Sequence, residues 1–424
     1  MQSKKCSIGL TVAILTVTLL VAGARAVAQE QVLYDFNLNK YGATPYGGLM
    51  TDGYGNLYGT TSAGGPSNHT GTVFEFSPQT DGSWKYTVLH SFSDANSVKG
   101  GAEPYAGLIS DASGNLYGTT HIGGKYGYGT VFELVKPTAG TTWKWELLHS
   151  FNDDGTDGFE PAFASLVLDP GGNLYGTSYY GGANNVGIVF ELVKPTKGKV
   201  WVEKILHNFE GNPTDGANPS AGLTFDGKGN LYGTTTYGDT NGLYNSGTVF
   251  ELSPNGSGGW NYVGVLHNFS NDGVDGSEPG NGSLVFDASN NLYGTTVGGG
   301  TNQLGTVFEL SPNESGGWTE VLLYDFGSYP TDGVFPYSGL TFDATGNLYG
   351  TTSQGGANAG DGTVFELSQN GDGVWTETLL HSFNNNGMDG FEPDAGVVLY
   401  AGNLYGTTPG GGTYTYGTVY EVTP

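Results

Sequence analysis

Short apolar runs separated by polar, glycine-rich segments follow one another along almost the whole chain. One cycle comprises residues 339–343, 347–352, 362–367 and 375–383, in which Leu, Val, Phe, Trp and Thr predominate. Runs of this length and composition are typical of β-strands, and none of them has the 3.6-residue period of a long amphipathic helix. The pattern therefore predicts an all-β fold built from units of four antiparallel strands.

The segments between these runs contain the residues that tight turns require. Residues 343–346 read Asp-Ala-Thr-Gly, and equivalent segments lie at 111–114 and 169–172. A leading aspartate and a final glycine with positive φ predict a hairpin between the first two strands. Residues 370–373, Asn-Gly-Asp-Gly, predict a second turn between the third and fourth strands.

The unit is repeated, and the sequence Asn-Leu-Tyr-Gly-Thr marks each copy. It begins at Asn56, Asn115, Asn173, Asn230, Asn291, Asn347 and Asn403. Successive copies start 56 to 61 residues apart, which leaves no room for a second domain between them. Seven four-stranded units of this length predict a seven-bladed β-propeller with four antiparallel strands per blade.

The two ends of the chain predict how the ring closes. The seventh copy stops after its third strand, at residues 418–422, and so lacks a fourth strand. Residues 32–36, Val-Leu-Tyr-Asp-Phe, match the fourth-strand segment at 321–326 and belong to no complete copy. We therefore expect the N-terminal strand to complete the last blade, which removes the exposed edges of an open repeat.

The repeat resembles a known family. The order Asp-x-x-Gly-Asn-Leu-Tyr-Gly-Thr-Thr, Gly-Gly and Gly-Thr-Val-Phe-Glu-Leu, as at 343–367, is similar to the tandem GloVer repeat of bacterial secreted proteins with varied C-terminal anchors. The resemblance identifies the repeat. It implies no established activity, so no catalytic residue is carried over from the family. Pro424 follows a strand directly, so the end of this chain departs from the anchored pattern of that family. The order Gly298-Gly299, Phe308, Trp318 is also similar to kelch repeats, which are propeller blades.

The first 28 residues have the pattern of a cleaved signal peptide. Lys4 and Lys5 precede an apolar run from residue 8 to 22, and Ala-Val-Ala at 26–28 supplies small residues for cleavage. We expect residues 29–424 to form a single propeller domain, exported to the periplasm or the medium, without a membrane span. The only cysteine, Cys6, lies in the leader, which excludes disulfides and thiolate chemistry from the mature chain.

The charge balance excludes one class of partner. The chain has 14 Lys and Arg against 40 Asp and Glu, a formal net charge of −26. A nucleic-acid partner requires a basic surface, so we expect none. The acidity is explained by solubility outside the cell or, alternatively, by attraction for cations or cationic partners.

Polar residues present in every copy are best explained by what every blade needs. One fourth-strand position holds His90, His149, His207, His267 and His381, with Tyr34 and Tyr324 in the other two copies. Each third strand holds a glutamate, namely Glu75, Glu133, Glu191, Glu251, Glu309, Glu366 and Glu421. We interpret the histidines as packing residues with a polar tip, and the glutamates as hydrogen-bonded groups rather than a ring of ligands. The tryptophans that open fourth strands, Trp84, Trp201, Trp260, Trp318, Trp375 and either Trp143 or Trp145, are expected to pack between blades.

The loops from each fourth strand to the next first strand predict a binding face. They contain Asp-Gly and often a glutamate before proline, as at residues 152–161. In an up-and-down blade they share one end with the second-to-third loops, which carry Tyr126, Tyr128, Tyr179, Tyr180, Tyr237, Tyr244, Tyr414 and Tyr416. The predicted ligand-binding residues are Asp157, Glu160, Tyr179, Tyr180, Asp215, Tyr237, Asp275 and Asp389.

Carboxylates beside aromatic rings suit a carbohydrate, and clustered oxygen atoms also suit Ca²⁺, although no cofactor is required. The alternative is that Asp-Gly only forms turns and the tyrosines are ordinary surface residues. We favour a monomeric binding or scaffold protein whose partner is a carbohydrate or an extracellular protein. A glycosidase or lyase using Asp153, Asp154 or Glu160, and a structural envelope or matrix protein, remain alternatives. His69 and His121 lie outside the repeat pattern and have no metal-binding spacing.

Overall fold

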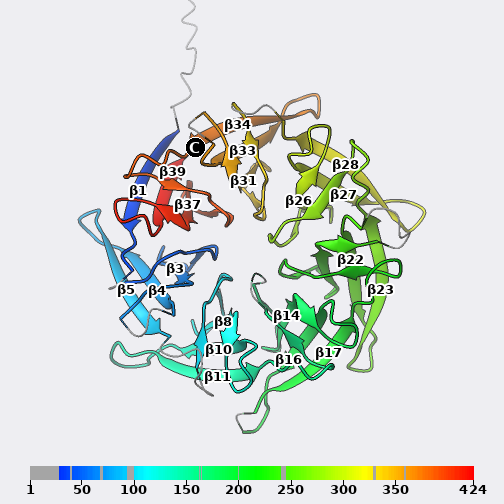
Figure 1. Cartoon of the computed structure of the whole chain (residues 1–424), viewed down its shortest axis with the longest axis horizontal. Coiled ribbons are helices and arrows are strands. Elements are labelled where there is room, and N and C mark those ends of the chain that lie inside the picture. Colours follow the sequence, from blue (N-terminus) through cyan, green and yellow to red (C-terminus); the bar gives the residue numbers. More distant parts are fainter. Residues whose placement is uncertain are drawn as a thin grey trace, which may run out of the picture.

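Seven antiparallel sheets, each containing the four strands of one blade, form a closed ring in the computed structural model of the chain (Figure 1). The structure describes residues 28–424 except 39–40, 67–69, 93–99, 162, 164, 199, 240–244, 328–330 and 358–359. The signal-peptide prediction and the loop residues His69 and Tyr244 lie outside the described residues. Among the described residues, no helix is long and apolar enough to cross a membrane. The predicted seven-bladed propeller is confirmed.

Each blade runs from a short inner strand to a long outer strand, as the repeat predicts. Blades 1 to 3 comprise β2 (Met50–Thr51), β3 (Leu57–Thr61), β4 (Thr72–Pro78) and β5 (Trp84–Ser91); β7 (Ile109–Ser110), β8 (Leu116–Thr120), β10 (Thr130–Val135) and β11 (Lys144–Ser150); and β13 (Val167–Leu168), β14 (Leu174–Ser178), β16 (Ile188–Val193) and β17 (Val202–Asn208). Blades 4 and 5 comprise β19 (Thr224–Phe225), β20 (Leu231–Thr235), β22 (Thr248–Pro254) and β23 (Trp260–Asn268), then β25 (Val285–Phe286), β26 (Leu292–Gly299), β27 (Thr306–Pro312) and β28 (Trp318–Asp325). Blade 6 comprises β30 (Thr341–Phe342), β31 (Leu348–Thr352), β33 (Thr363–Gln369) and β34 (Trp375–Ser382).

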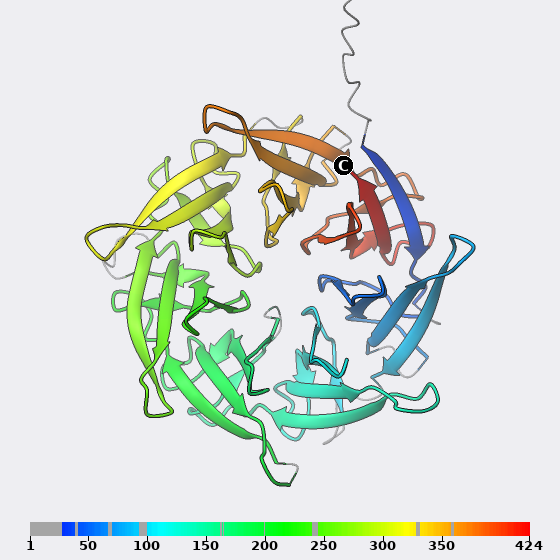
Figure 2. The same ribbon diagram turned by 180° about the vertical axis from the view of Figure 1, so that it is seen from behind.

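Blade 7 joins the two ends of the chain. It contains β36 (Val398–Tyr400), β37 (Asn403–Thr408) and β39 (Thr418–Thr423), and β1 (Gln29–Asp35) supplies its outer strand. β1 pairs antiparallel with β39, with Val32 opposite Tyr420, and the blue and red strands lie side by side in Figure 2. The predicted closure by the N-terminal strand is confirmed.

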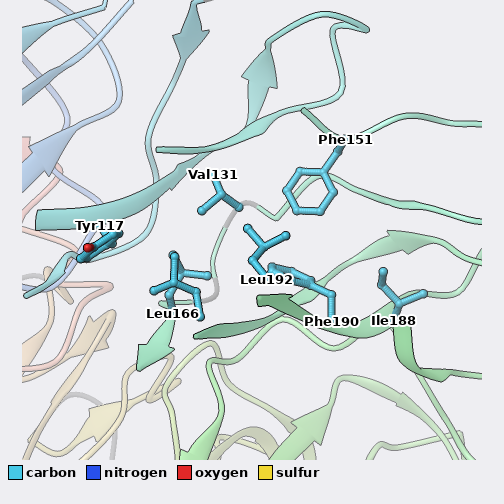
Figure 3. Packing of buried hydrophobic residues seen from close by; sticks show 8 residues of the cluster. Tyr117, Val131, Phe151, Leu166, Ile188, Phe190 and Leu192 are labelled. Carbon is cyan, nitrogen blue, oxygen red and sulfur yellow. The ribbon is translucent and has the colours of Figure 1, made fainter. Parts of the chain in front are cut away.

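The core lies between neighbouring blades. Tyr117, Val131 and Phe151 of blade 2 pack against Leu166, Leu174, Ile188, Phe190 and Leu192 around blade 3 (Figure 3). Each middle strand is covered on both faces, so β14 is buried along its whole length and shows no alternation of apolar and polar residues. The glycine of Asn-Leu-Tyr-Gly-Thr allows this close packing. A Cβ at Gly176 would lie 2.7 Å from the Phe190 ring and 2.9 Å from Leu166.

The same repeat accounts for the polar groups within each blade. The hydroxyl of Tyr175 lies 3.1 Å from Glu191 and 3.2 Å from Asp169, the aspartate of the preceding hairpin. Equivalent tyrosine–glutamate hydrogen bonds are present in blades 1, 2, 4 and 7. In these blades the third-strand glutamates are hydrogen-bonded, as predicted.

The tryptophans pack across the blade junctions. The ring of Trp201 in blade 3 meets the edge of Tyr117 in blade 2 at 6.4 Å, and Trp84, Trp143, Trp260 and Trp318 make the same kind of contact. In blade 2 this contact is made by Trp143, whereas Trp145 stacks on His90. The structure thus settles which of the two tryptophans occupies the repeat position.

Candidate functional site

The fourth-to-first loops and the second-to-third loops meet at one end of the ring, as the strand order requires. Short strands join them: β12 (Gly158–Phe159), for example, pairs with β15 (Tyr180–Gly181). The other pairs are β6 (Gly101–Ala102) with β9 (Ile122–Gly123), β18 (Gly216–Ala217) with β21 (Tyr237–Gly238), β24 (Gly276–Pro279) with β26, β29 (Gly333–Val334) with β32 (Gln354–Gly355), and β35 (Gly390–Phe391) with β38 (Gly410–Gly411). These pairs hold the two sets of loops against each other.

A turn at positive φ directs every fourth-to-first loop inward. Glu160, which precedes a proline, has a φ of 55°. Its amide donates to Tyr128 O in the preceding blade at 3.2 Å, and its carbonyl accepts from Tyr179 N at 3.3 Å. The equivalent residues with positive φ are Thr44, Glu103, Asn218, Glu278, Phe335 and Glu392. This conformation is costly for residues with a side chain, so its repetition indicates that the inter-blade hydrogen bonds over-determine it.

The residues that follow these prolines surround one cavity of about 540 Å³, which we call the axial cavity. Its wall is formed by segments preceding every blade except the fourth: Tyr46–Gly48, Tyr105–Gly107, Phe163 with Ser165, Asn281–Ser283, Tyr337–Thr341 and Glu392 with Asp394–Val397. Val285, Ser353 and Gln354 complete the lining. The size is that of a small-molecule binding site.

Aromatic rings cluster on one side of the axial cavity. The ring centroids of Tyr46 and Tyr105 are 5.3 Å apart, and those of Tyr105 and Phe163 are 5.7 Å apart. Tyr46, Phe163 and Tyr337 are each more than one-third exposed. The cavity therefore offers a ligand the faces and edges of several aromatic rings, with glycine and serine backbone between them.

Carboxylates give the axial cavity a negative potential. Burial, with a contribution from Glu392, raises the pKa of Asp394 from 3.8 to about 7. Burial, with the charges of Asp394 and Glu392, also raises the pKa of Tyr46. The pKa of Tyr337 is raised by burial first and then by the charges of Asp394 and Glu278. None of the described residues in the lining is Lys, Arg or His. The lining can therefore accept hydrogen bonds from hydroxyl or ammonium groups and disfavours anions.

The four aspartates predicted as ligand-binding residues lie away from this cavity, against the fourth-strand histidines. The distances from the aspartate Oδ2 to the histidine Nε2 are 3.3 Å for Asp157–His149, 2.8 Å for Asp215–His207, 3.4 Å for Asp275–His267 and 3.1 Å for Asp389–His381. Each aspartate also accepts backbone amides, as Asp157 does from Asn152 at 3.0 Å. All four carboxylates are largely buried. The histidines also meet the phenylalanine two positions later edge-on, which agrees with a packing role.

The predicted tyrosines lie on the rim of the same end, outside the lining of the axial cavity. Tyr180 is 37% exposed and stacks on Phe159 with ring centroids 5.5 Å apart. Tyr179 meets Tyr180 edge-on at 4.7 Å. Burial, followed by the nearby Tyr237, raises the pKa of Tyr179 to about 12. Tyr179, Tyr180 and Tyr237 thus form an aromatic surface near Glu160, and the four aspartates are not part of it.

Asp153 and Asp154, two of the predicted catalytic candidates, are exposed in the loop before blade 3. Asp154 Oδ1 accepts the Thr156 hydroxyl at 2.7 Å and amides of Thr156 and Asp157 at 2.9 and 3.1 Å. These bonds, that of the hydroxyl first, lower the pKa of Asp154 to about 2. Asp154 forms a turn, whereas Glu160 is half-buried at the inward bend. Neither Asp153, Asp154 nor Glu160 lines the axial cavity.

Sequence reasoning missed the residues that do line the cavity. Tyr46, Tyr105, Tyr337 and Asp394 each come directly after the loop proline. The signal that marks them is their position. Each lies one residue after an X-Pro pair that recurs in the repeat. Because the residue type at this position changes from blade to blade, the repeated motif does not mark it.

Solved structures share the fold at low sequence identity. The polysaccharide lyase Uly1 is 11% identical, with 96% of this chain and 94% of that chain covered and a TM-score of 0.52. An ulvan lyase of polysaccharide lyase family 25, bound to -[GlcA(1-4)Rha3S]-, is 10% identical, with coverages of 91% and 94% and a TM-score of 0.46. A luciferin-regenerating enzyme is 16% identical, with coverages of 75% and 90% and a TM-score of 0.43. The likeness to Uly1 shows a common propeller architecture alone.

Comparison of the sequence with protein families identifies the repeat more specifically than the structural likeness does. No curated protein matches the chain. The model of the Gloeobacter/Verrucomicrobia repeat matches residues 83–262 and again residues 239–424. These matches extend over most of the propeller and agree with the resemblance drawn from the repeated motif. The chain therefore belongs to the Gloeobacter/Verrucomicrobia repeat family.

Proposed function

We propose that the chain binds a neutral or amino-sugar polysaccharide segment in the axial cavity. The observation that carries the proposal is the cluster of Tyr46, Tyr105 and Phe163 rings in the same cavity as Glu392 and Asp394. Sugar rings present an apolar face that packs on aromatic side chains, while their hydroxyls donate to carboxylates. The cavity contains both kinds of group within one concave surface.

The charge of the cavity narrows the class of sugar. Asp394 and Glu392 lie together, and no described cationic side chain lines the cavity to balance a uronate or sulfate group. An anionic polysaccharide would meet like charge there and across a chain of net charge −26. Neutral sugars avoid this cost, and an amino sugar would gain from it.

An extracellular ligand requires export, and the pattern of residues 1–28 supplies a route to the periplasm or the medium. The rim tyrosines Tyr179, Tyr180 and Tyr237 would extend the surface over which a longer polymer lies. Asp157, Asp215, Asp275 and Asp389 would support this rim by holding the loops, rather than by touching the sugar.

The test is a thermal-unfolding screen of purified protein against soluble neutral, amino-sugar and uronic-acid oligosaccharides, each with Ca²⁺ and with a chelator. A ligand that binds the native state and not the unfolded state raises the unfolding temperature, and the shift grows with the ratio of ligand concentration to Kd. We expect a shift with a neutral or amino sugar that is smaller or absent with uronates. A shift confined to uronates, or none with any sugar, would contradict the proposal. A shift seen with Ca²⁺ and lost with the chelator would indicate that calcium takes part in sugar binding.

A hydrolase acting in the same cavity is the second candidate, and one observation favours it. Asp394, whose pKa burial raises to about 7, lies near Glu392, so the cavity holds two neighbouring carboxyl groups, one of which keeps its proton close to neutral pH. Glycoside hydrolysis uses such a pair. Release of reducing ends from the bound polysaccharide that D394N abolishes, with binding retained, would establish hydrolysis. Binding without release would leave the chain a binding protein.

A further inference from the structure

The outer strands of neighbouring blades meet through two kinds of contact. At three junctions an aromatic ring of the next blade stacks on the fourth-strand histidine or tyrosine: Tyr86 on Tyr34 at 4.4 Å, Trp145 on His90 at 5.9 Å and Tyr262 on His207 at 3.9 Å. At the other four junctions a glutamate takes the place of the ring: Glu30, Glu203, Glu320 and Glu377. The glutamate lies four residues before the histidine or tyrosine of its own strand.

Three of the glutamate junctions combine a histidine, an aspartate and a glutamate. The groups are His149, Asp157 and Glu203 between blades 2 and 3; His267, Asp275 and Glu320 between blades 4 and 5; and His381, Asp389 and Glu30 between blades 6 and 7. In each group one ligand atom per residue lies within 4.8 Å of the other two. We call these groups the junction triads.

The spacing of the ligand atoms fits a small divalent ion. His149 Nε2 lies 3.3 Å from Asp157 Oδ2 and 3.7 Å from Glu203 Oε1. His267 Nε2 lies 3.4 Å from Asp275 Oδ2 and 3.7 Å from Glu320 Oε1. Tetrahedral zinc with bonds of about 2.0–2.1 Å places its ligand atoms roughly 3.3 Å apart. Two independent junctions thus repeat one geometry near this value.

The triads also contain buried polar atoms without partners. Among the described residues, Glu203 Oε1, Glu320 Oε1, Glu30 Oε1, His267 Nε2 and Asp157 Oδ1 are buried and make no hydrogen bond of good geometry. Among the ion pairs of the described residues, no Lys or Arg reaches a triad. Two carboxylates that face each other in a partly dry site need a cation or a shared proton. The histidine present in each triad supplies a nitrogen ligand, which favours a bound cation over a shared proton.

We infer that each junction triad binds a first-row divalent ion, Zn²⁺ being the probe of choice, through histidine Nε2 and one oxygen from each carboxylate. Three protein ligands leave one position for water. Mixed imidazole and carboxylate ligands favour zinc and its neighbours over Mg²⁺. The histidine and glutamate side chains of the first two triads retain 16–19% exposure, so an ion can reach them from solvent.

Bound ions would fasten alternate junctions of the ring. The triad between blades 6 and 7 would fix β1 through Glu30, which stands two residues after the predicted cleavage position. The ion would then tie the strand that closes the propeller to the blade before it. This role is independent of the axial cavity and of the sugar proposed there.

The experiment is zinc titration of tag-free, chelator-stripped protein by calorimetry, with metal content measured after dialysis. We expect three ions per chain, two for E203Q or E320Q, and one for the double variant. E377Q is the matched control, because Glu377 occupies the same strand position but faces Tyr324 instead of a histidine, and it should retain three.

Circular dichroism checks that each variant is folded, and H149Q serves in place of E203Q if that variant is not. Fewer than three zinc ions per wild-type chain would overturn the inference that every triad binds an ion. A stoichiometry that E203Q and E320Q leave unchanged would also overturn it.

Discussion

The imidazole Nε2 of His207 lies 2.8 Å from Oδ2 of Asp215, eight residues later in the chain. The same spacing joins His149 to Asp157 and His381 to Asp389, and in blade 5 the Tyr324 hydroxyl donates to Asp332 at 3.0 Å. The contact links the last strand of one blade to the loop that enters the next. It therefore holds the loops whose last residues line the axial cavity.

Replacing Asp215 tests this supporting role. Asp215 Oδ1 accepts the amides of Glu210 at 2.8 Å and Gly211 at 2.9 Å, and the side chain is almost fully buried. D215A leaves these donors and His207 without an acceptor, so we expect a loss of about 2–4 kcal/mol in the free energy of unfolding. Urea denaturation measures it. D153A, at an exposed position, should change it by less than about 0.5 kcal/mol, and equal effects would count against the role.

The close packing at the repeat glycine predicts a second effect. A methyl group at Gly176 would press on the Phe190 ring and on Leu166. G176A should lower the free energy of unfolding by about 1–3 kcal/mol through overpacking. G227A is the control, because nothing lies within 4 Å of the added carbon there. If both variants unfold at the same urea concentration, the glycine is not required by packing.

Closure of the ring predicts a large cost at Phe36. This residue follows β1, is fully buried, and packs with Phe74 of blade 1 and Val419 of blade 7. F36A should destabilise the fold by about 3–5 kcal/mol, as for a core aromatic residue. V202A, at a mostly exposed position of an outer strand, serves as comparison. A near-neutral F36A in urea denaturation would mean that the N-terminal strand contributes little to closure.

The raised pKa of Asp394 predicts a pH dependence. Its pKa of about 7 in the folded state exceeds its ordinary value of 3.8, so between these values the folded state binds more protons than the unfolded state. The free energy of unfolding therefore falls as pH rises across this window, by at most about 1.4 kcal/mol per pH unit from this group. When the pH is raised from 5 to 7.5, the free energy of unfolding of the wild type should therefore fall relative to that of D394N. A constant difference would show that Asp394 titrates normally.

The sequence predicts the fold well because the residues that build it recur. Asn-Leu-Tyr-Gly-Thr carries the buried leucine, the tyrosine that bonds Glu191 and the glycine under Phe190, so blade number and strand order could be read from it. The two-residue strands such as β12 were not predicted, since they depend on contact between two loops.

The candidate site was harder to predict, for a physical reason. Tyr105 and Asp394 reach one cavity only because Glu103 and Glu392 adopt positive φ, a conformation that residue type does not announce. The sequence places the aspartates on the binding face because Asp-Gly marks a loop, whereas the histidines that they contact belong to the preceding strand. Their constant separation of eight residues, as in His207 and Asp215, was the available sign of pairing.

The most direct test of the proposed function is the affinity of Y105A for the sugar that the wild-type protein binds, measured by calorimetry. Tyr105 contacts both Tyr46 and Phe163 and lies in the wall of the axial cavity. Y54A is the control, because Tyr54 is 84% exposed in a hairpin at the opposite end of the blade. The account predicts at least a tenfold loss of affinity for Y105A and none for Y54A. Unchanged affinity in Y105A would place the ligand elsewhere and contradict the account.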